Sequence, residues 1–169
     1  MQFSEEEIKK YGGLSARELT DRGICPTCFD RATGGAVFGD NSDKMIYQSQ
    51  TIEVFLAGNP RAEGHTVIAT VPHYQDLSEV PADLVSVLAE AAAHMMRNIR
   101  EVYGCERVYL CSMCDGPANH CHLQLIPRYA DEERGSANFV KPRKDYVHDQ
   151  AKLNRLRALA SDMLLSKHL

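Results

Sequence analysis

The sequence lacks the features that define several broad classes of protein. Its 169 residues contain no apolar stretch near the roughly 20 residues that a helix needs to cross a bilayer. It also has no basic excess, because 19 Lys and Arg residues stand against 23 Asp and Glu and give a formal net charge of −4. Proteins that bind duplex nucleic acids usually carry such an excess. We therefore expect no membrane partner and no nucleic-acid partner.

The sequence also lacks internal repeats, low-complexity segments and linkers. This absence, together with the length, predicts one domain over residues 1–169. The first ten residues, MQFSEEEIKK, are acidic and polar and do not resemble a secretory signal. We therefore expect a cytoplasmic protein. In that reducing compartment the six cysteines are not expected to form disulfides.

Hydrophobic periodicity predicts an α+β fold built on one mainly antiparallel sheet. The predicted order is helix, several strands, a long helix, two strands and a helix. Helix formers over 4–21 are broken by Gly12-Gly13, and residues 23–28 are interpreted as a tight turn. The remaining predicted elements are strands over 36–38, 44–48, 52–56, 66–71, 107–111 and 120–126, and helices over 82–103 and 146–168.

The segment from His120 to Arg128 carries polar side chains at alternate positions. Residues two apart on a strand point to the same face, so His120, His122 and Gln124 share one face, with Arg128 further along it. Such a row would be costly in a core without partners, but it suits a site. An imidazole can attack phosphorus, an amide can stabilise the charged oxygens, and a guanidinium pairs well with phosphate. The simpler alternative is a pair of half-exposed histidines on an edge strand.

Four of the six cysteines form two C-x-x-C pairs, Cys25/Cys28 and Cys111/Cys114. One such pair supplies half of a tetrahedral zinc site. Both pairs together can form a four-cysteine site, because thiolates suit zinc equally well. The remaining alternative is that the cysteines are small buried residues without a metal.

Three landmarks in this sequence together resemble the histidine-triad superfamily. The segment His120–Ile126, HCHLQLI, resembles the H-φ-H-φ-H/Q-φ-φ signature of that family. Residues 59–73, with a Pro, a Gly-His pair and an apolar strand, resemble its second landmark. The Cys25-x-x-Cys28 pair resembles the N-terminal pair of zinc-bearing members. The landmarks follow the family's order, and the resemblance covers about residues 24–128.

For the fold, the resemblance implies a HIT-like domain. This domain has a mainly antiparallel five-stranded sheet, one long helix and a C-terminal helix. Its core covers 24–128, and residues 129–169 form a C-terminal loop and helix. The resemblance also implies a homodimer.

For the chemistry, the resemblance implies nucleotidyl transfer or hydrolysis through a covalent intermediate on the middle residue of the triad, His122. The first residue, His120, orients the nucleophile or binds zinc, and His65 orients the triad through a hydrogen bond. The implied substrate is a small nucleotide, and the implied cofactor is a structural zinc ion. Its ligands are expected to be Cys25, Cys28, His73 and His120.

The third triad position is Gln124 rather than His. This resembles the branch that contains galactose-1-phosphate uridylyltransferase and dinucleoside-polyphosphate phosphorylases. The short single chain, however, resembles the small hydrolase members, so the acceptor stays open between water and phosphate. Two departures concern substrate binding. Ala57 stands where family members often carry Asp or Asn for the ribose hydroxyls, and residues 115–119 replace a Gly-Gln element. The replacement binding residues that we expect are Asn59, Ser112 and Asn119, together with Arg128.

Two rival functions remain at this point. One is a catalytically silent HIT-fold protein that binds nucleotides or acts as a scaffold, which Ala57 and the missing Gly-Gln element favour. The other is an enzyme that processes nucleic-acid ends, against which the acidic net charge counts. The segment Lys141-Pro142-Arg143 has two interpretations, a solvated basic loop or a loop that contacts phosphates.

Overall fold

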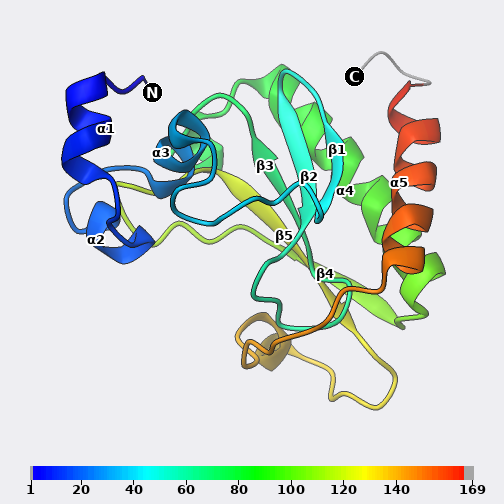
Figure 1. The fold of residues 1–169 in the computed structure, drawn as a ribbon. Coiled ribbons are helices and arrows are strands. Elements are labelled where there is room, and N and C mark those ends of the chain that lie inside the picture. The colour runs from blue at the N-terminus through cyan, green and yellow to red at the C-terminus, as the bar shows by residue number, and fades with distance from the viewer. Residues whose placement is uncertain (1, 166–169) are drawn as a thin grey trace.

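A five-stranded antiparallel sheet organises the molecule, in the strand order β1-β2-β3-β5-β4 (Figure 1). The computed structural model describes residues 2–165, with the backbone alone described for 162–165. The predicted α+β class with one antiparallel sheet is therefore confirmed. The strands are β1 (Met45–Gln48), β2 (Ile52–Leu56), β3 (Thr66–Thr70), β4 (Arg107–Cys111) and β5 (His122–Arg128).

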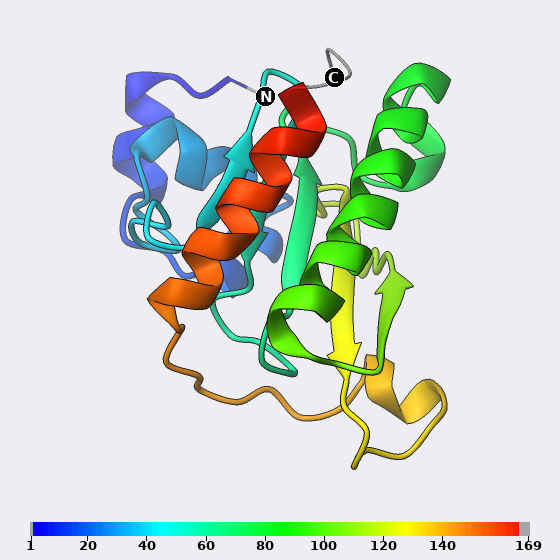
Figure 2. The ribbon, with the colours of Figure 1, turned by 90° about the vertical axis from the view of Figure 1, so that its right-hand side faces the viewer.

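Two helices cover one face of this sheet (Figure 2). Helix α4 (Ala82–Tyr103) has the predicted bounds, because Pro81 precedes its first turn and Gly104 adopts the left-handed conformation that ends it. Helix α5 (Gln150–Leu165) begins later than predicted, because the carboxylate of Asp149 accepts hydrogen bonds from the backbone N–H groups of residues 151 and 152. Residues 166–168 of the predicted helix lie outside the described part of the chain.

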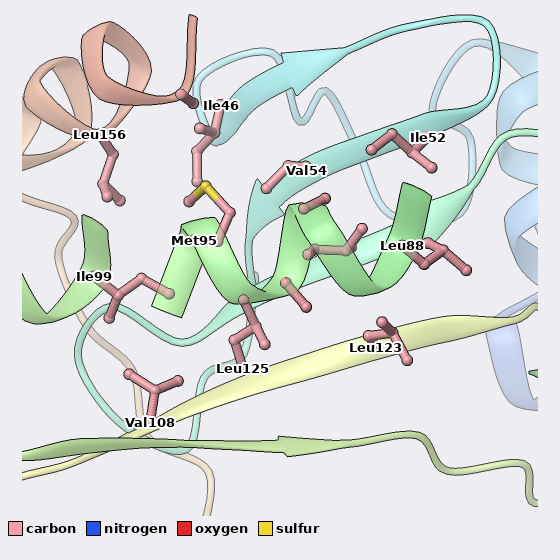
Figure 3. Packing of buried hydrophobic residues seen from close by; sticks show 14 of the residues in the cluster. Ile46, Ile52, Val54, Leu88, Met95, Ile99, Val108, Leu123, Leu125 and Leu156 are labelled. Atoms are coloured by element: carbon pink, nitrogen blue, oxygen red, sulfur yellow. The ribbon is translucent and has the colours of Figure 1, made fainter. Parts of the chain in front are cut away.

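The hydrophobic core lies between these helices and the sheet (Figure 3). Leu88, Met95 and Ile99 of α4 are fully buried against strand residues such as Val54 and Leu125. Their spacing along the helix is the one that puts side chains on a single face. The opposite face of the sheet is consequently left for a site.

The N-terminal region forms three short helices, α1 (Glu5–Tyr11), α2 (Ala16–Thr20) and α3 (Pro26–Thr33), on the side of the sheet away from α5 (Figure 1). The prediction of a tight turn over 23–28 was wrong from residue 26 onward. Pro26 occupies the first helical position, and the Cys25 sulfur accepts a hydrogen bond from the Cys28 N–H, so this segment starts α3.

Two other predicted elements differ in the structure. Residues 36–38 form a turn instead of a strand, because the Asp30 carboxylate accepts hydrogen bonds from the backbone N–H groups of Val37 and Phe38. Strand β5 begins at His122 rather than at residue 120, since the Cys121 N–H donates to the carbonyl of Tyr74 at 2.7 Å. Two 3-10 helices, η1 (Leu77–Glu79) and η2 (Ser136–Phe139), complete the described structure. None of the helices in residues 2–165 combines the length and apolar character needed to cross a membrane.

Candidate active site and metal centre

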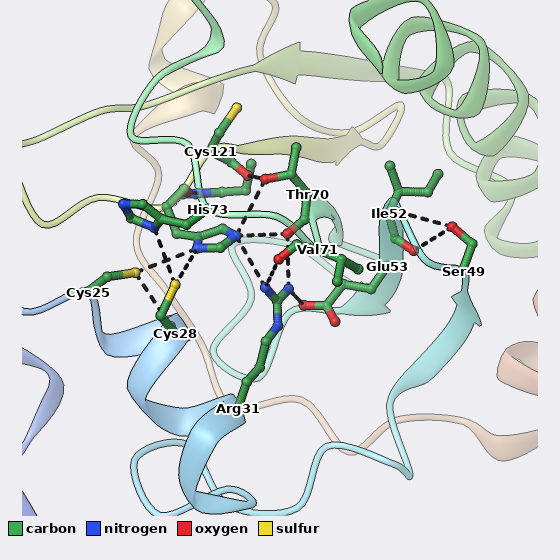
Figure 4. Close-up of polar contacts among 12 residues, drawn as sticks. Cys25, Cys28, Arg31, Ser49, Ile52, Glu53, Thr70, Val71, His73 and Cys121 are labelled. Carbon is green, nitrogen blue, oxygen red and sulfur yellow. Dashed lines mark hydrogen bonds and ion pairs between the residues drawn. The ribbon is translucent and has the colours of Figure 1, made fainter. Parts of the chain in front are cut away.

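A cluster of two cysteines and two histidines joins α3 to the sheet (Figure 4). Cys25 and Cys28 come from the first turn of α3, His73 follows β3, and His120 precedes β5. The four donor atoms lie within 4.8 Å of one another. The fold thus brings together the four residues that the sequence analysis predicted as zinc ligands.

The geometry of the cluster fits a tetrahedral ion. The Cys28 sulfur lies 3.3 Å from His73 Nδ1 and 3.4 Å from His120 Nδ1, and the Cys25 sulfur lies 3.6 Å from His120 Nδ1. Zinc bonds of about 2.3 Å to sulfur and about 2.0 Å to nitrogen at tetrahedral angles place these atoms about 3.5 Å apart. A hydrogen bond between the two thiol groups lowers the pKa of Cys25 to about 3, and the same pairing raises the pKa of Cys28. A divalent cation would favour ionisation of both thiols.

The surroundings of His120 fix its ring for metal binding. The carbonyl of Thr70 lies 2.7 Å from His120 Nε2 and can only accept, so Nε2 carries the hydrogen and Nδ1 offers its lone pair to the cluster. Arg31 of α3 donates to the same carbonyl at 3.1 Å and to that of Val71 at 2.8 Å, and it forms an ion pair with Glu53 (Figure 4). These contacts tie α3 to β2 and β3 beside the cluster.

His122 is the next residue of the alternating motif, at the start of β5. Its Nδ1 lies 2.7 Å from the carbonyl oxygen of His120, which can only accept, so Nδ1 carries the hydrogen. The lone pair is therefore on Nε2, and the side-chain nitrogen of Gln124 lies 3.5 Å from that atom. The half-buried His122 ring offers a nucleophilic nitrogen at a defined position.

His65 lies just before β3 and is buried on the same face of the sheet. Its Nδ1 accepts a hydrogen bond of 3.1 Å from the backbone N–H of Arg61, so Nε2 carries the hydrogen. Burial, together with the nearby charges of Arg143 and Arg61, lowers the pKa of His65 to about 4. This histidine is therefore neutral at neutral pH.

A cavity of about 1010 Å³ opens on the face of the sheet that α4 and α5 leave uncovered. The strands supply its floor, and α3 with the glycine-containing segment after it supplies a wall. Three of the four histidines described above, His65, His120 and His122, line it, and His73 does not. The lining residues that matter for the site are His65, His120, His122, Gln124, Ala57, Asn59, Arg31, Glu53 and Arg143.

The other predicted binding residues have different environments. Asn59 is exposed and lines the main cavity. Asn119 lines a smaller cavity of about 270 Å³ that also reaches His122, although its amide already donates to the carbonyl of Gln75 at 2.6 Å. The Ser112 hydroxyl donates to the carbonyl of His122 at 3.1 Å, so it contacts the backbone of the histidine.

Arg128, which was predicted to bind substrate, is not among the residues that line the cavity. Although it is on the same face as Gln124, its guanidinium is buried in an ion pair of 2.8 Å with Glu106. It also donates to the carbonyls of Tyr129 and Glu132. These partners occupy the group that was expected to bind phosphate.

The second cysteine pair lies apart from the metal cluster. Cys111, at the end of β4, is half-buried, and Cys114 is exposed in the following loop. Among residues 2–165, the group of potential metal ligands contains neither of them. The four-cysteine alternative therefore has no support in the geometry.

Sequence reasoning missed the roles of Arg31 and Glu53 and left Arg143 open. Arg31 follows the segment that was interpreted as a turn, so no helix was expected to carry it. Glu53 lies on a predicted strand but belongs to no recognisable motif. Only the tertiary fold brings these side chains to one cavity.

Comparison with known proteins agrees with this geometry. The HIT domain family model matches residues 39–131, more than half of the chain. The chain belongs to the HIT domain family, and its fold is HIT-like.

One curated relative and two solved structures illustrate the similarity. An uncharacterized HIT-like protein of Methanocaldococcus jannaschii is 25% identical over 107 residues, which cover 61% of this chain and 79% of the relative. A zinc-bound histidine triad family protein from Mycobacterium smegmatis has a TM-score of 0.58 at 21% identity, covering 73% of this chain and 87% of that one. Diadenosine triphosphate hydrolase from Plasmodium falciparum has a TM-score of 0.51 at 10% identity, covering 77% and 82%. At these identities the two structures support the fold alone.

Proposed function

We propose that this protein is a nucleotidyl hydrolase or transferase that acts through a covalent nucleotidyl-histidine at His122. The substrate is a nucleotide phosphoester or phosphoanhydride, such as a dinucleoside polyphosphate or a conjugate of a nucleoside monophosphate. The observation that carries the proposal is the hydrogen bond of 2.7 Å between His122 Nδ1 and the carbonyl of His120. This bond holds the hydrogen on Nδ1 and leaves Nε2 as the nucleophile.

The reaction has two steps. His122 Nε2 attacks the α-phosphorus in line, the N–P bond forms, and the leaving group departs with the electron pair of its P–O bond and takes a proton from solvent. Water or phosphate then attacks the same phosphorus and releases His122. The His120 carbonyl stabilises the positive ring of the intermediate by accepting from Nδ1, and Gln124 is placed to donate to the phosphoryl oxygens.

The neutral state of His65 supports a positioning role within this scheme. His65 lines the cavity, and Gln124 is among the side chains that influence its ring. We expect the Nε2–H to hold the Gln124 side chain in position beside His122. Because burial and cationic neighbours keep the ring uncharged, its hydrogen-bonding pattern stays constant across neutral pH.

We also propose a structural zinc ion at Cys25, Cys28, His73 and His120. The donor set and its spacing support this ion, and the neighbour from Mycobacterium smegmatis is described as zinc-bound. When bound, zinc would supply a cross-link between α3 and the start of β5, beside His122. No step of the reaction passes through the metal.

The proposal includes transfer to phosphate, which Gln124 suggests. It also includes a homodimer, which the family resemblance implies. The Plasmodium neighbour is named as a diadenosine triphosphate hydrolase, and in the proposal both water and phosphate are kept as acceptors. A catalytically silent nucleotide-binding protein is the second candidate, because Ala57 at the cavity floor offers no carboxylate to ribose hydroxyls.

The test is intact-protein mass spectrometry of the wild type and of His122→Ala after brief incubation with a nucleotide panel. Dinucleoside polyphosphates, UDP-sugars and nucleoside phosphoramidates form the panel, and the quench is alkaline because it preserves the N–P bond. A mass increase of one nucleotidyl group in the wild type alone is expected. Circular dichroism of the variant checks that the fold survives.

Retained turnover in His122→Ala would falsify the mechanism. Nucleotide binding without an adduct or product in the wild type would instead favour the silent protein.

A further inference from the structure

The main cavity is lined by three cations, Arg31, Lys44 and Arg143. Arg31 forms an ion pair with Glu53, and Lys44 lies 3.8 Å from the carboxylate of Asp43. Within residues 2–165, the ion pairs include no carboxylate for Arg143. Arg143, an exposed side chain at the rim, therefore brings to the cavity a positive charge that has no ion-pair partner among the described residues.

Backbone contacts hold Arg143 in this position. Its Nη1 donates to the carbonyl of Asn59 at 2.6 Å. Next to it, the Lys144 N–H donates to the carbonyl of Pro60 at 2.9 Å, and Arg61 Nη1 donates to that of Lys141 at 2.6 Å. Segment 141–144 is thus fastened to the turn between β2 and β3, which favours a positioned cation over a freely solvated loop.

A second cation lies close by. Burial lowers the pKa of Arg143, and the charge of Arg61 lowers it further, so the two guanidiniums repel each other. The Nε atom of Arg61 is buried without a hydrogen-bond partner in the described part of the chain, and so is Nε2 of His65. Arg143 and His65 line the cavity and Arg61 does not, so Arg143 is the cation of the pair that a ligand would meet. The charge of Arg61 behind it adds to the positive potential that attracts an anion.

The position of this charge separates it from the reacting histidine. His122 is paired with Ala69 near the end of β3, whereas Arg143 Nη1 contacts the carbonyl of Asn59 in the turn that precedes β3. The two side chains therefore reach the cavity from different ends of this strand. This placement favours two different groups of one ligand, one at His122 and one at Arg143.

We propose that Arg143, with Arg61 behind it, forms a second anion subsite that binds a phosphate group of the substrate other than the one that His122 attacks. The inference rests on the proposed function for its substrate class. The second phosphate has two possible sources, the phosphate chain beyond the reacting phosphorus or an ester on the sugar. The same guanidinium recognises either one.

The experiment is isothermal titration calorimetry of His122→Ala, which cannot turn over substrate under the proposed mechanism. The probes are AMP, ADP and adenosine 3′,5′-bisphosphate, with the uridine series alongside. Within each series the probes differ only in the presence and place of the second phosphate. A charge-assisted bidentate contact is worth about 10-fold or more in affinity, so ADP or the bisphosphate should bind about 10-fold tighter than AMP.

Adding Arg143→Gln should remove that preference, while Arg143→Lys should retain part of it. Arg97→Gln is the matched control, because Arg97 is an exposed arginine on α4, on the other side of the sheet. It should leave all affinities unchanged. Tighter binding of ADP would show that the second phosphate belongs to the phosphate chain. Tighter binding of the bisphosphate would show that it is an ester on the sugar.

The subsite is overturned if no probe with a second phosphate binds better than its monophosphate, or if the preference survives Arg143→Gln. If His122→Ala does not fold, inorganic pyrophosphate is titrated into the wild type and Arg143→Gln with the same expectation, since it carries no nucleotidyl group. If anion binding depends on Arg143 but no adduct forms at His122, the subsite is supported and the catalytic function is rejected. If an adduct forms at His122 but anion binding does not depend on Arg143, the catalytic function is supported and the subsite is rejected.

Discussion

At the scale of single residues, His65 shows how the fold sets the protonation of a side chain. The Arg61 N–H occupies its Nδ1, and burial beside Arg143 and Arg61 disfavours a further positive charge. An unfolded histidine has a pKa near 6.5, whereas this one has a pKa of about 4. The unfolded chain therefore binds a proton more readily than the folded chain between these two values.

This difference makes a prediction about stability and pH. The contribution of His65 is fully present above pH 6.5 and is lost as the pH falls towards 4, because protonation then favours unfolding. Between pH 7.5 and 5 the loss is about 2 kcal/mol. Urea denaturation of the wild type and of His65→Asn, which keeps an acceptor for the Arg61 N–H, measures it. The stability of the wild type relative to the variant should fall by that amount, and parallel pH profiles would contradict the assignment.

At the scale of elements, α3 depends on contacts outside itself. It has eight residues, which is too short to be stable alone in water. Arg31 joins it to the sheet on one side, and the cysteines of its first turn join the histidine cluster on the other (Figure 4). The proposed metal ion at the cluster would therefore stabilise the folded arrangement of this helix.

Removal of the metal should therefore destabilise the protein. We expect purified protein to contain about one zinc per chain, and chelation or Cys28→Ser to cost about 3 kcal/mol, or 6–12 °C in melting temperature. Elemental analysis and thermal denaturation are the measurements. Cys114→Ser is the control, because that exposed thiol is outside the cluster. Equal metal content and melting temperature in the two variants would rule out the site.

At the scale of the whole molecule, a single hydrophobic cluster contains residues from the predicted domain core, 24–128, and from the C-terminal helix. Leu153, Leu156 and Ala160 of α5 are fully buried in the same cluster as Leu88 of α4 and Val54 of β2. Sharing this core opposes independent unfolding of residues 129–169. We therefore propose that the chain is a single domain.

A substitution in α5 tests the single domain. Leu156→Ala should cost about 2–5 kcal/mol, because it opens a cavity in the shared core, and unfolding should remain one transition. Urea denaturation followed by circular dichroism and by tyrosine fluorescence measures both. Val147→Ala, at an exposed position just ahead of α5, should change the stability by less than about 0.5 kcal/mol. Separate transitions for the two probes would indicate two folding units.

The sequence by itself determined the elements whose signals are local. Pro81 and Gly104 mark both ends of α4, and the periodicity between them depends only on neighbouring residues. The alternation after His120 predicted which residues share a face, because strand geometry has a period of two. The expected zinc ligands and the proposed nucleophile followed from the family resemblance.

Only the tertiary structure decided which of these side chains are available to a ligand. Arg128 and Arg143 are both arginines near polar segments, yet Arg128 forms an ion pair with Glu106, whereas Arg143 lines the cavity and forms no ion pair among the described residues. Likewise, Asp30 holds residues 36–38 in a turn that their apolar character did not predict. The physical reason is that charge pairing and burial depend on residues distant in sequence, which local patterns do not report.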